Sequence, residues 1–444
     1  MTVQSINPWS GAVQYRYDYQ GDDVVEATLA RAAEAYPAWA ALPLERRGEF
    51  VRAAGAALRA RRDDIASTMT AEMGKLRREA LAEVDKCAAA CDYYADHAAD
   101  YLRDEPIATE AVRSYVTYEP IGCVFAVMPW NFPIWQVFRF LAPALMAGNV
   151  AVLKHATNVP RCADAIAGVL QAAGLPEGVF GVLHIDNDMA AKVIADPRVK
   201  AVTLTGSERA GRSVAGNAGA HLKKCVMELG GSDPFVVLDD ADLDLTVKMA
   251  VASRYGNSGQ TCIAAKRFIV TAGVADEFVR RFSAAASALQ VGNPADEGTT
   301  LAPMARADLR DDLHEQVVAS IGAGARALIG CVPGAGPCEY RPRSSTTSAP
   351  ACRPTTRSCS ARSRASCAWP TTSRPYGSPT TPASAWAPAS GPPTRPAARP
   401  WRGACRPAPA SSTPSSAATC GCPSAAPRPP DSAVNWPSTA STSS

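Results

Sequence analysis

The chain has 444 residues, of which 47% are hydrophobic and 20% are charged, and its formal net charge is +3. This length is too great for one ordinary core and predicts two or three domains. No apolar run is long enough to span a bilayer, and residues 1–22 lack the pattern of a secretory signal. We therefore expect a cytoplasmic protein without a membrane or nucleic-acid partner, although the net charge alone argues neither way on nucleic acid.

The last hundred residues have a different composition from the rest. Residues 341–444 hold 20 of the 36 prolines and 12 arginines but one acidic residue, Asp431, and Val434 is their only aliphatic residue larger than alanine. Such a segment cannot bury enough apolar area to offset the entropy of ordering its backbone. Eight of the 14 cysteines lie from Cys331 onward, at spacings that fit neither a disulfide framework nor a zinc site. The composition predicts a disordered tail over residues 342–444 and no metal site.

The first hundred residues are predicted to be helical. Apolar residues at helical spacing indicate helices from residue 22 to Pro37, over 49–68 and over 78–102. Short apolar runs then predict strands over residues 115–118, 122–128, 149–153, 179–185, 199–204, 225–229 and 235–238, with one helix ending at Gly174 and another opening at Ser207. This alternation predicts an α/β fold with a mostly parallel sheet covered on both faces. Ligands bind such sheets at the carboxyl ends of the strands.

Residues that can carry chemistry gather at the predicted strand ends and loops. They are the segment Met128–Pro133, Lys154, the turn Thr205–Ser207, the segment Glu228–Gly231 and the loop Asn257–Cys262. A lone cysteine is usually a small buried hydrophobe. Gly259 and its polar neighbours predict a turn, however, which would offer the Cys262 thiol to a cleft, where a thiolate attacks carbonyls well.

The other candidates each have a structural alternative. Glu228 is either a salt-bridged surface acid or, at the end of an apolar strand, a buried carboxylate suited to general-base work. Asn131 either stabilises its loop or donates its amide to an oxyanion. Lys154 is either a solvated strand cap or a ligand of a nucleotide ribose or phosphate. Gly206 and Ser207 form either a plain N-cap or a pyrophosphate site at a helix N-terminus.

The order of these motifs is specific. The strings P-W-N-F-P, T-G-S, E-L-G-G and N-x-G-Q-x-C resemble those of the aldehyde dehydrogenase superfamily, and the resemblance covers residues 1 to about 340. The string from Gln260 to Phe268 is similar to that of bacterial succinate-semialdehyde dehydrogenases. The resemblance implies a Rossmann-type cofactor domain with preceding helices over residues 1–230 and a truncated α/β catalytic domain over 231–341. It also implies a homo-oligomer, which we expect this chain to have lost.

The resemblance also implies a mechanism and a substrate, an aldehyde. Cys262 would attack the aldehyde, Asn131 and the backbone N–H of Cys262 would hold the oxyanion, and Glu228 would activate water to hydrolyse the thioester. The implied cofactor is NAD or NADP, held by Trp130, Asn131, Lys154, Thr157, Gly206, Ser207 and Leu229.

Two positions bear on the choice of cofactor and substrate. NAD-preferring members often have a glutamate where this chain has Thr157, and a neutral residue there is expected to tolerate NADP. Arg139 stands where similar succinate-semialdehyde dehydrogenases bind the substrate carboxylate, and its alternative is a structural ion pair. Some members of the family have a second arginine at the position that Gly256 occupies in this chain.

The tail lacks the family string E-x-x-F-G-P. When residues 356–363 are back-translated and read one base earlier, they can give E-E-L-F-G-P-V, and the same shift recovers further family strings later in the tail. We infer a single-base loss near Pro342 and Arg343.

The competing interpretation of the tail is a basic disordered segment that binds acidic partners. The competing interpretation of the function is a non-catalytic nucleotide-binding fragment. A truncated domain would leave the apolar residues Val236, Val237, Ile269 and Val270 uncovered and prone to aggregation.

Overall fold

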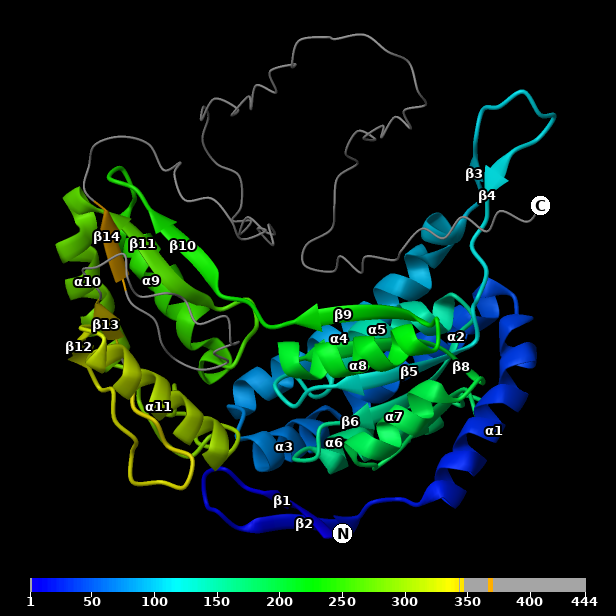
Figure 1. Ribbon diagram of the computed structural model, residues 1–444, viewed down its shortest axis with the longest axis horizontal. Coiled ribbons are helices and arrows are strands. Elements are labelled where there is room, and N and C mark those ends of the chain that lie inside the picture. Colours follow the sequence, from blue (N-terminus) through cyan, green and yellow to red (C-terminus); the bar gives the residue numbers. More distant parts are fainter. Residues whose placement is uncertain (1, 343, 347–365, 370–444) are drawn as a thin grey trace. The chain divides into compact units, whose positions relative to one another are not determined.

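The computed structural model describes residues 2–342, 344–346 and 366–369 (Figure 1). Most of the predicted disordered tail, and the segment 356–363 that carries the frameshift argument, lie outside the described residues. Among the residues described, no helix is both long and apolar enough to cross a membrane.

The N-terminal region is helical but opens with a hairpin that the sequence analysis missed. Strands β1 (Thr2–Ile6) and β2 (Val13–Asp18) pair antiparallel. The helices that follow are α1 (Asp22–Ala40), α2 (Leu44–Ala60), α3 (Arg62–Met73) and α4 (Arg77–Leu102), and the short strands β3 (Glu105–Pro106) and β4 (Tyr115–Val116) form a second hairpin.

Two predicted helix boundaries are wrong. Pro37 lies inside α1, which continues to Ala40 and buries Trp39. Because the lost backbone donor falls near the helix end, burial of the indole offsets its cost. The predicted helix over 49–68 is two helices, α2 and α3, which meet at Arg61, whose φ of −105° and ψ of 17° interrupt the helix.

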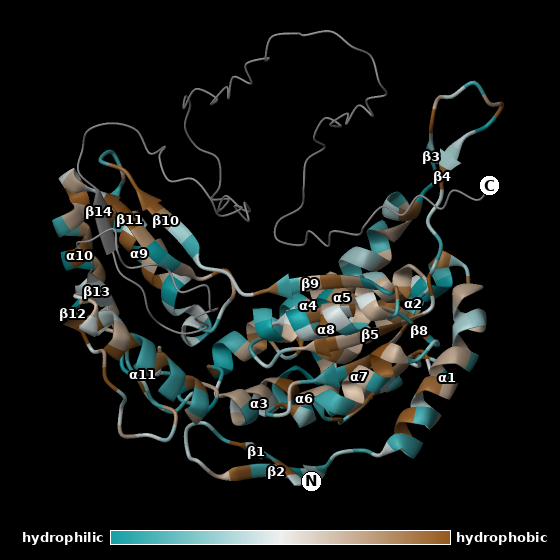
Figure 2. Cartoon of the chain, viewed as in Figure 1, coloured by the Kyte–Doolittle hydropathy of each residue, from teal (hydrophilic) through white to brown (hydrophobic). Residues whose placement is uncertain are grey.

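The first large sheet has five strands, all paired in parallel in the order β7-β6-β5-β8-β9 (Figure 1). Its elements are β5 (Cys123–Met128), α5 (Trp135–Met146), β6 (Val150–His155), α6 (Pro160–Ala172), β7 (Phe180–Val182), α7 (Asn187–Ala195), β8 (Val199–Gly206), α8 (Glu208–Ala220) and β9 (Lys224–Leu229). The inner strands are strongly hydrophobic (Figure 2), and β6 is buried along its whole length, as expected of a sheet covered on both faces.

The strand order places a topological switch between β5 and β8. The chain moves outward from β5 through β6 to β7, then returns to pair β8 with the other side of β5. Loops on either side of such a switch leave in opposite directions and open a crevice at the carboxyl ends of the strands. Those ends belong to the segments that the sequence analysis selected.

The second large sheet has the order β10-β11-β14-β13-β12. Its elements are β10 (Asp233–Val237), α9 (Leu243–Tyr255), the 3-10 helix η1 (Gly256–Gly259), β11 (Ala265–Thr271), α10 (Ala272–Ser287), α11 (Ala307–Gly322), β12 (Arg326–Ile329), β13 (Ser344–Thr346) and β14 (Ser366–Trp369). Its core includes an aromatic cluster in which Phe268 contacts both Phe278 and Phe282.

Two short segments of the predicted disordered tail belong to this sheet, which corrects the prediction there. Strand β14 pairs in parallel with β11, and β13 pairs with β12. Strand pairing uses backbone N–H and C=O groups, so a segment without large aliphatic residues can still supply it. The predicted uncovered apolar face is also wrong in part, because Val237 and Val270 are each 1% exposed, whereas Val236 is 58% exposed.

Candidate active site

Strand register brings the predicted residues of the first sheet to one edge. Lys154 on β6 is level with Val127 on β5, and Thr205 on β8 is level with Glu228 on β9. The loop containing Asn131 follows β5 directly, and Ser207 follows β8. Segments far apart in sequence therefore share the carboxyl edge of the sheet, where ligands bind.

A buried ion pair holds the loop that contains Asn131. On α4, Glu83 accepts hydrogen bonds at Oε1 from the backbone N–H groups of Ile134 and Trp135, both at 2.9 Å, at the start of α5. Its Oε2 pairs with the Lys75 ammonium, and both side chains are almost fully buried. The same ammonium lies 3.8 Å from the ring centroid of Phe132. The carboxylate thus caps a helix N-terminus, where negative charge is favourable, and fixes the loop.

The Cys262 loop is held by an unusual backbone. Asn257, Ser258 and Gly259 all have φ between 52° and 75°, the left-handed region. This region costs a non-glycine residue roughly 1–2 kcal/mol, so surrounding contacts must enforce it. Glu79 accepts from the backbone N–H of Asn257 at 3.1 Å, and the Ser258 hydroxyl donates to the Ala302 carbonyl at 3.0 Å. Glu79 and Glu83 are four residues apart on α4, which puts them on one face of the helix.

Reciprocal hydrogen bonds join the two loops to each other. The Asn131 amide Nδ2 donates to the Gln260 carbonyl at 3.0 Å, and the Asn257 amide Nδ2 donates to the Asn131 carbonyl at 2.8 Å. Gln260 is itself 1% exposed and accepts at Oε1 from the Ala305 N–H. Asn131 therefore does stabilise its loop, and its side chain lies next to the backbone that leads into Cys262.

Cys262 differs from the cysteines inside the fold. Burial raises the pKa of the Cys91 and Cys123 thiols to about 12, and Cys87 and Cys162 are buried as well. Such thiols stay protonated and inert. Cys262 is partly exposed, and its Sγ makes no hydrogen bond to any residue that the structure describes. Cys262 lies in a turn, as expected, and is partly exposed; Cys225 on β9 is exposed as well.

Lys266, which the sequence analysis missed, ties Cys262 to the Glu228 segment. Its buried ammonium donates to the Cys262 carbonyl at 2.8 Å and to the Gly231 carbonyl at 2.5 Å. A Cβ on Gly231 would lie 3.4 Å from the same Cys262 carbonyl oxygen, so glycine suits this close approach. One charged side chain thus holds the nucleophile candidate and the end of the E-L-G-G segment together.

The prediction that Glu228 is buried is wrong. β9 is an edge strand, so the Glu228 side chain is 45% exposed, and its Oε2 lies 2.8 Å from Nη2 of Arg139 on α5. The alternative for Glu228 was a salt-bridged acid, and the alternative for Arg139 was a structural ion pair. Both describe this one salt bridge, which joins the predicted base to the predicted substrate-binding arginine.

The predicted cofactor residues lie at the same edge. Lys154 is 6% exposed, so most of its side chain is buried rather than extended into solvent. Burial lowers its pKa, and the nearby Asp186 partly offsets this. Ser207 is the N-cap of α8, accepting from the Ala210 N–H at 3.2 Å. Leu229, on β9, packs close to Gly211, which lies in α8.

The remaining cofactor candidates are less constrained. Thr157, in the loop after β6, accepts at its carbonyl from the Tyr17 hydroxyl at 3.1 Å. Trp130 and Gly206 are partly exposed. A largely buried lysine and an adjacent helix N-terminus fit the ribose and phosphate groups of a dinucleotide.

His155 is a second residue that the sequence analysis missed. Its Nε2 donates to the Pro133 carbonyl at 2.8 Å, and its Nδ1 accepts from the Ala156 N–H at 2.8 Å. This pattern requires the neutral imidazole, and burial lowers the pKa of His155 to about 4. The ring therefore fastens the Asn131 loop to the end of β6.

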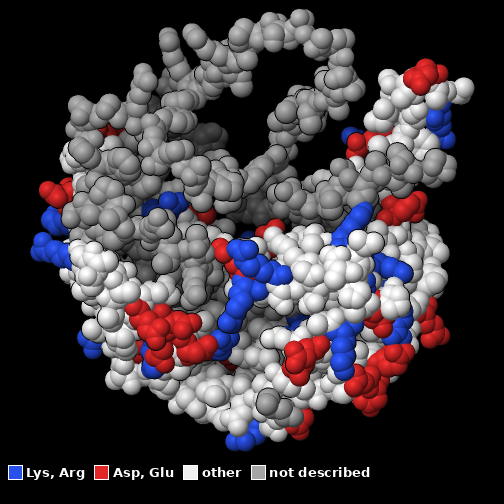
Figure 3. Space-filling view, in the orientation of Figure 1, with Lys and Arg blue, Asp and Glu red and all other residues white. Residues whose placement is uncertain are grey.

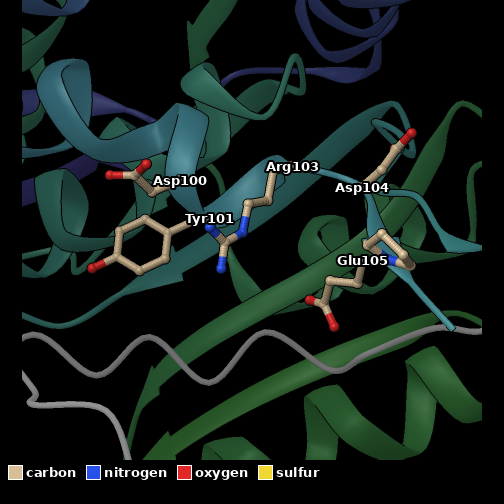
Figure 4. Close-up of a pocket in the computed structure, with 6 residues that line it drawn as sticks. Asp100, Tyr101, Arg103, Asp104 and Glu105 are labelled. Atoms are coloured by element: carbon tan, nitrogen blue, oxygen red, sulfur yellow. The ribbon is translucent and has the colours of Figure 1, made fainter.

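Other surface features are separate from this edge. A surface cavity of about 570 Å³ is lined by Asp100, Tyr101, Arg103, Asp104, Glu105 and Pro106 and contains none of the site residues (Figure 4). Basic and acidic side chains are interspersed on the face seen in Figure 3. The described residues contain no group of three or more His, Cys, Asp or Glu that could hold a metal ion.

Comparison with known proteins decides the family. Residues 1–341 match the aldehyde dehydrogenase family. The chain belongs to this family. A probable NADP(+)-type succinate-semialdehyde dehydrogenase of Synechocystis is 49% identical over 357 residues, covering 80% of this chain and 79% of that protein. The Escherichia coli NAD(P)+ succinate semialdehyde dehydrogenase Sad is 50% identical over 338 residues, covering 76% and 73%.

Solved structures agree with the family assignment. The crystal structure of succinic semialdehyde dehydrogenase from Streptococcus pyogenes in complex with NADP+ superposes with a TM-score of 0.80 at 36% identity, covering 84% of this chain and 82% of that one. The predicted aldehyde dehydrogenase-like α/β fold is confirmed. The family match ends at residue 341, where the composition of the chain changes.

The buried pair under the Asn131 loop gives a first prediction. Glu83→Gln should cost about 3–5 kcal/mol of unfolding free energy, because it leaves the buried Lys75 ammonium without its carboxylate. Lys75→Met combined with Glu83→Gln should cost far less than the sum of the single changes, since the amide oxygen still accepts from α5. Denaturant unfolding measures this coupling. The exposed pair Arg62 and Asp85, treated in the same way, should show much weaker coupling. If the losses of unfolding free energy in the two single variants, at Lys75 and at Glu83, simply added in the double variant, this account would be contradicted.

The neutral His155 gives a second prediction. Its unfolded pKa is about 6.5 and its folded pKa about 4, so between these values the unfolded chain binds a proton that the folded chain does not. Stability should therefore fall as the pH drops from 6.5 to 4, by up to about 3 kcal/mol from this residue. His155→Gln should flatten the pH dependence of the unfolding free energy, whereas the same change at the exposed His221 should not. Parallel curves for wild type and His155→Gln would be inconsistent with a buried neutral ring.

Proposed function

We propose that this chain is an NAD(P)+-dependent dehydrogenase that oxidises succinate semialdehyde to the acid. The observation that carries this proposal is the joining of an accessible Cys262 thiol, the Asn131 amide and the Glu228 segment by the hydrogen bonds of Gln260 and Lys266. Aldehyde oxidation through a covalent thioester needs these three groups: a nucleophile, an oxyanion donor and a base.

The cofactor would be held at the carboxyl edge of the first sheet. Lys154 would take the adenosine ribose hydroxyls or phosphate, because its largely buried side chain places a positive charge at that edge. Gly206 and Ser207 would present the N-terminus of α8 to the pyrophosphate, while Leu229 and Trp130 would flank the dinucleotide. The bound nicotinamide supplies the acceptor for hydride. Thr157 puts no negative charge beside the ribose, which supports use of NADP+.

The chain's own groups would carry the remaining steps. The Cys262 sulfur adds to the aldehyde carbon, and the developing oxyanion accepts hydrogen bonds from the Asn131 amide and the Cys262 backbone N–H. Loss of hydride leaves a thioester. Glu228 then takes a proton from water as the water oxygen adds to the thioester carbon, and the C–S bond breaks to release the acid and the Cys262 thiolate.

Substrate choice is assigned to Arg139. Its side chain is 24% exposed beside Glu228, and its guanidinium can bind a carboxylate through two parallel hydrogen bonds. The relatives reported above are named for succinate semialdehyde, an aldehyde whose far end is a carboxylate.

A second candidate function remains, a nucleotide-binding fragment without turnover. The observation behind it is that the family match stops at residue 341. NADP+ binding by the 444-residue chain without oxidation of any aldehyde would support this candidate. In that case, inserting one base near the codons of Pro342 and Arg343 should restore turnover, and turnover by the unaltered chain would exclude it.

Substitution of the two key residues gives a third prediction. Cys262→Ala should abolish NADPH formation, while Cys225→Ala, which removes an exposed cysteine on β9, should leave it unchanged. Glu228→Gln should retain a single burst of NADPH and slow the steady state at least about a hundredfold, since general-base catalysis contributes about 10²–10⁴. Rapid mixing with absorbance detection separates the burst from the steady state. An undiminished rate in Cys262→Ala would refute the assignment.

A further inference from the structure

The salt bridge between Arg139 and Glu228 bears on the order in which the substrate binds and Glu228 acts as a base. Nη2 of Arg139 lies 2.8 Å from Oε2 of Glu228, and neither side chain has a second ion-pair partner among the residues that the structure describes. The two side chains come from different elements, α5 and β9, and both are partly exposed at the carboxyl edge.

This contact joins the two groups that the proposed reaction needs. The guanidinium stands 2.8 Å from Oε2, so a water molecule cannot occupy that position beside this oxygen. A substrate carboxylate that binds Nη2 of Arg139 must compete with Glu228 for it. Separation of the pair would therefore release both groups at once.

We infer that the substrate's own carboxylate is this event: it replaces Glu228 on Arg139, and the displaced Glu228 becomes the general base. The exchange substitutes one carboxylate for another, so the guanidinium keeps an anionic partner throughout. A partly exposed ion pair is weak enough to be displaced in this way. The inference rests on the proposed function and adds to it a basis for specificity: an aldehyde without a carboxylate leaves Glu228 paired, and its thioester is hydrolysed slowly.

The exchange also predicts competition for a ligand that undergoes no chemistry. When the binding-competent state is only a fraction of the population, the apparent affinity falls by that fraction. Removing Glu228 as a competitor should therefore strengthen the binding of a dicarboxylate, even though Glu228 is itself part of the site.

The test is succinate binding by calorimetry to the full 444-residue chain. Glu228→Gln should bind succinate at least about fivefold more tightly than wild type, because the competitor is gone, and Arg139→Gln should bind it at least about tenfold more weakly. Glu228→Asp keeps the charge but shortens the reach to Arg139, so it should also bind more tightly. If simple charge repulsion governed binding, Glu228→Asp would match wild type.

Two controls complete the experiment. Glu49→Gln removes an exposed carboxylate that pairs with Arg46 on α2, and it should leave succinate binding unchanged. Butyramide, which has no carboxylate, should bind alike to all variants. Unchanged or weaker succinate binding in both Glu228 variants would overturn the inference. If the expected binding pattern is found but wild type oxidises no aldehyde, the exchange stands and the proposed oxidation fails.

Discussion

Two carboxylates, one turn apart on α4, set the geometry on which the rest of the site depends. Glu83 holds the start of α5 and with it the loop of Asn131, while Glu79 holds the N–H of Asn257 in the left-handed turn before Cys262. A single rigid helix thereby fixes two loops that come from different sheets. The hydrogen bonds between Asn131, Asn257 and Gln260 then close the arrangement. The left-handed turn keeps its strained conformation because contacts on several sides hold its backbone in place.

The site is built largely from buried charges that bind backbone groups. Lys75 pairs with Glu83 beneath one loop, and Lys266 donates to the carbonyls of Gly231 and Cys262 beneath the other. Burying a charge is costly unless it is paired or fully hydrogen-bonded. These residues therefore stabilise the loop positions only as complete sets, which makes the geometry specific. Lys154, also largely buried, carries the positive charge that the proposed function assigns to the nucleotide.

The parts of the fold that the sequence could predict are those with a local pattern. The apolar runs of β5, β6 and β8 and the N-cap at Ser207 follow from periodicity and capping chemistry. Glu79, Glu83 and Lys266 had no such signal, because their partners are distant in sequence: Glu79 and Asn257 are 178 residues apart. In sequence they resemble ordinary charged residues of a solvated helix or strand. Glu228 was misjudged because hydrophobic neighbours do not reveal that β9 is an edge strand, and β14 was missed because backbone pairing needs no hydrophobic side chains.

The most direct test of the account is the covalent state of Cys262. The Glu228→Gln variant is mixed with succinate semialdehyde and NADP+, quenched in acid, digested and analysed by mass spectrometry. The peptide that contains Cys262 should carry the mass of one succinyl group, and the peptide that contains Cys225 should be unmodified. An unmodified Cys262 peptide in protein that has formed NADPH would contradict the central claim, that this loop presents the nucleophile.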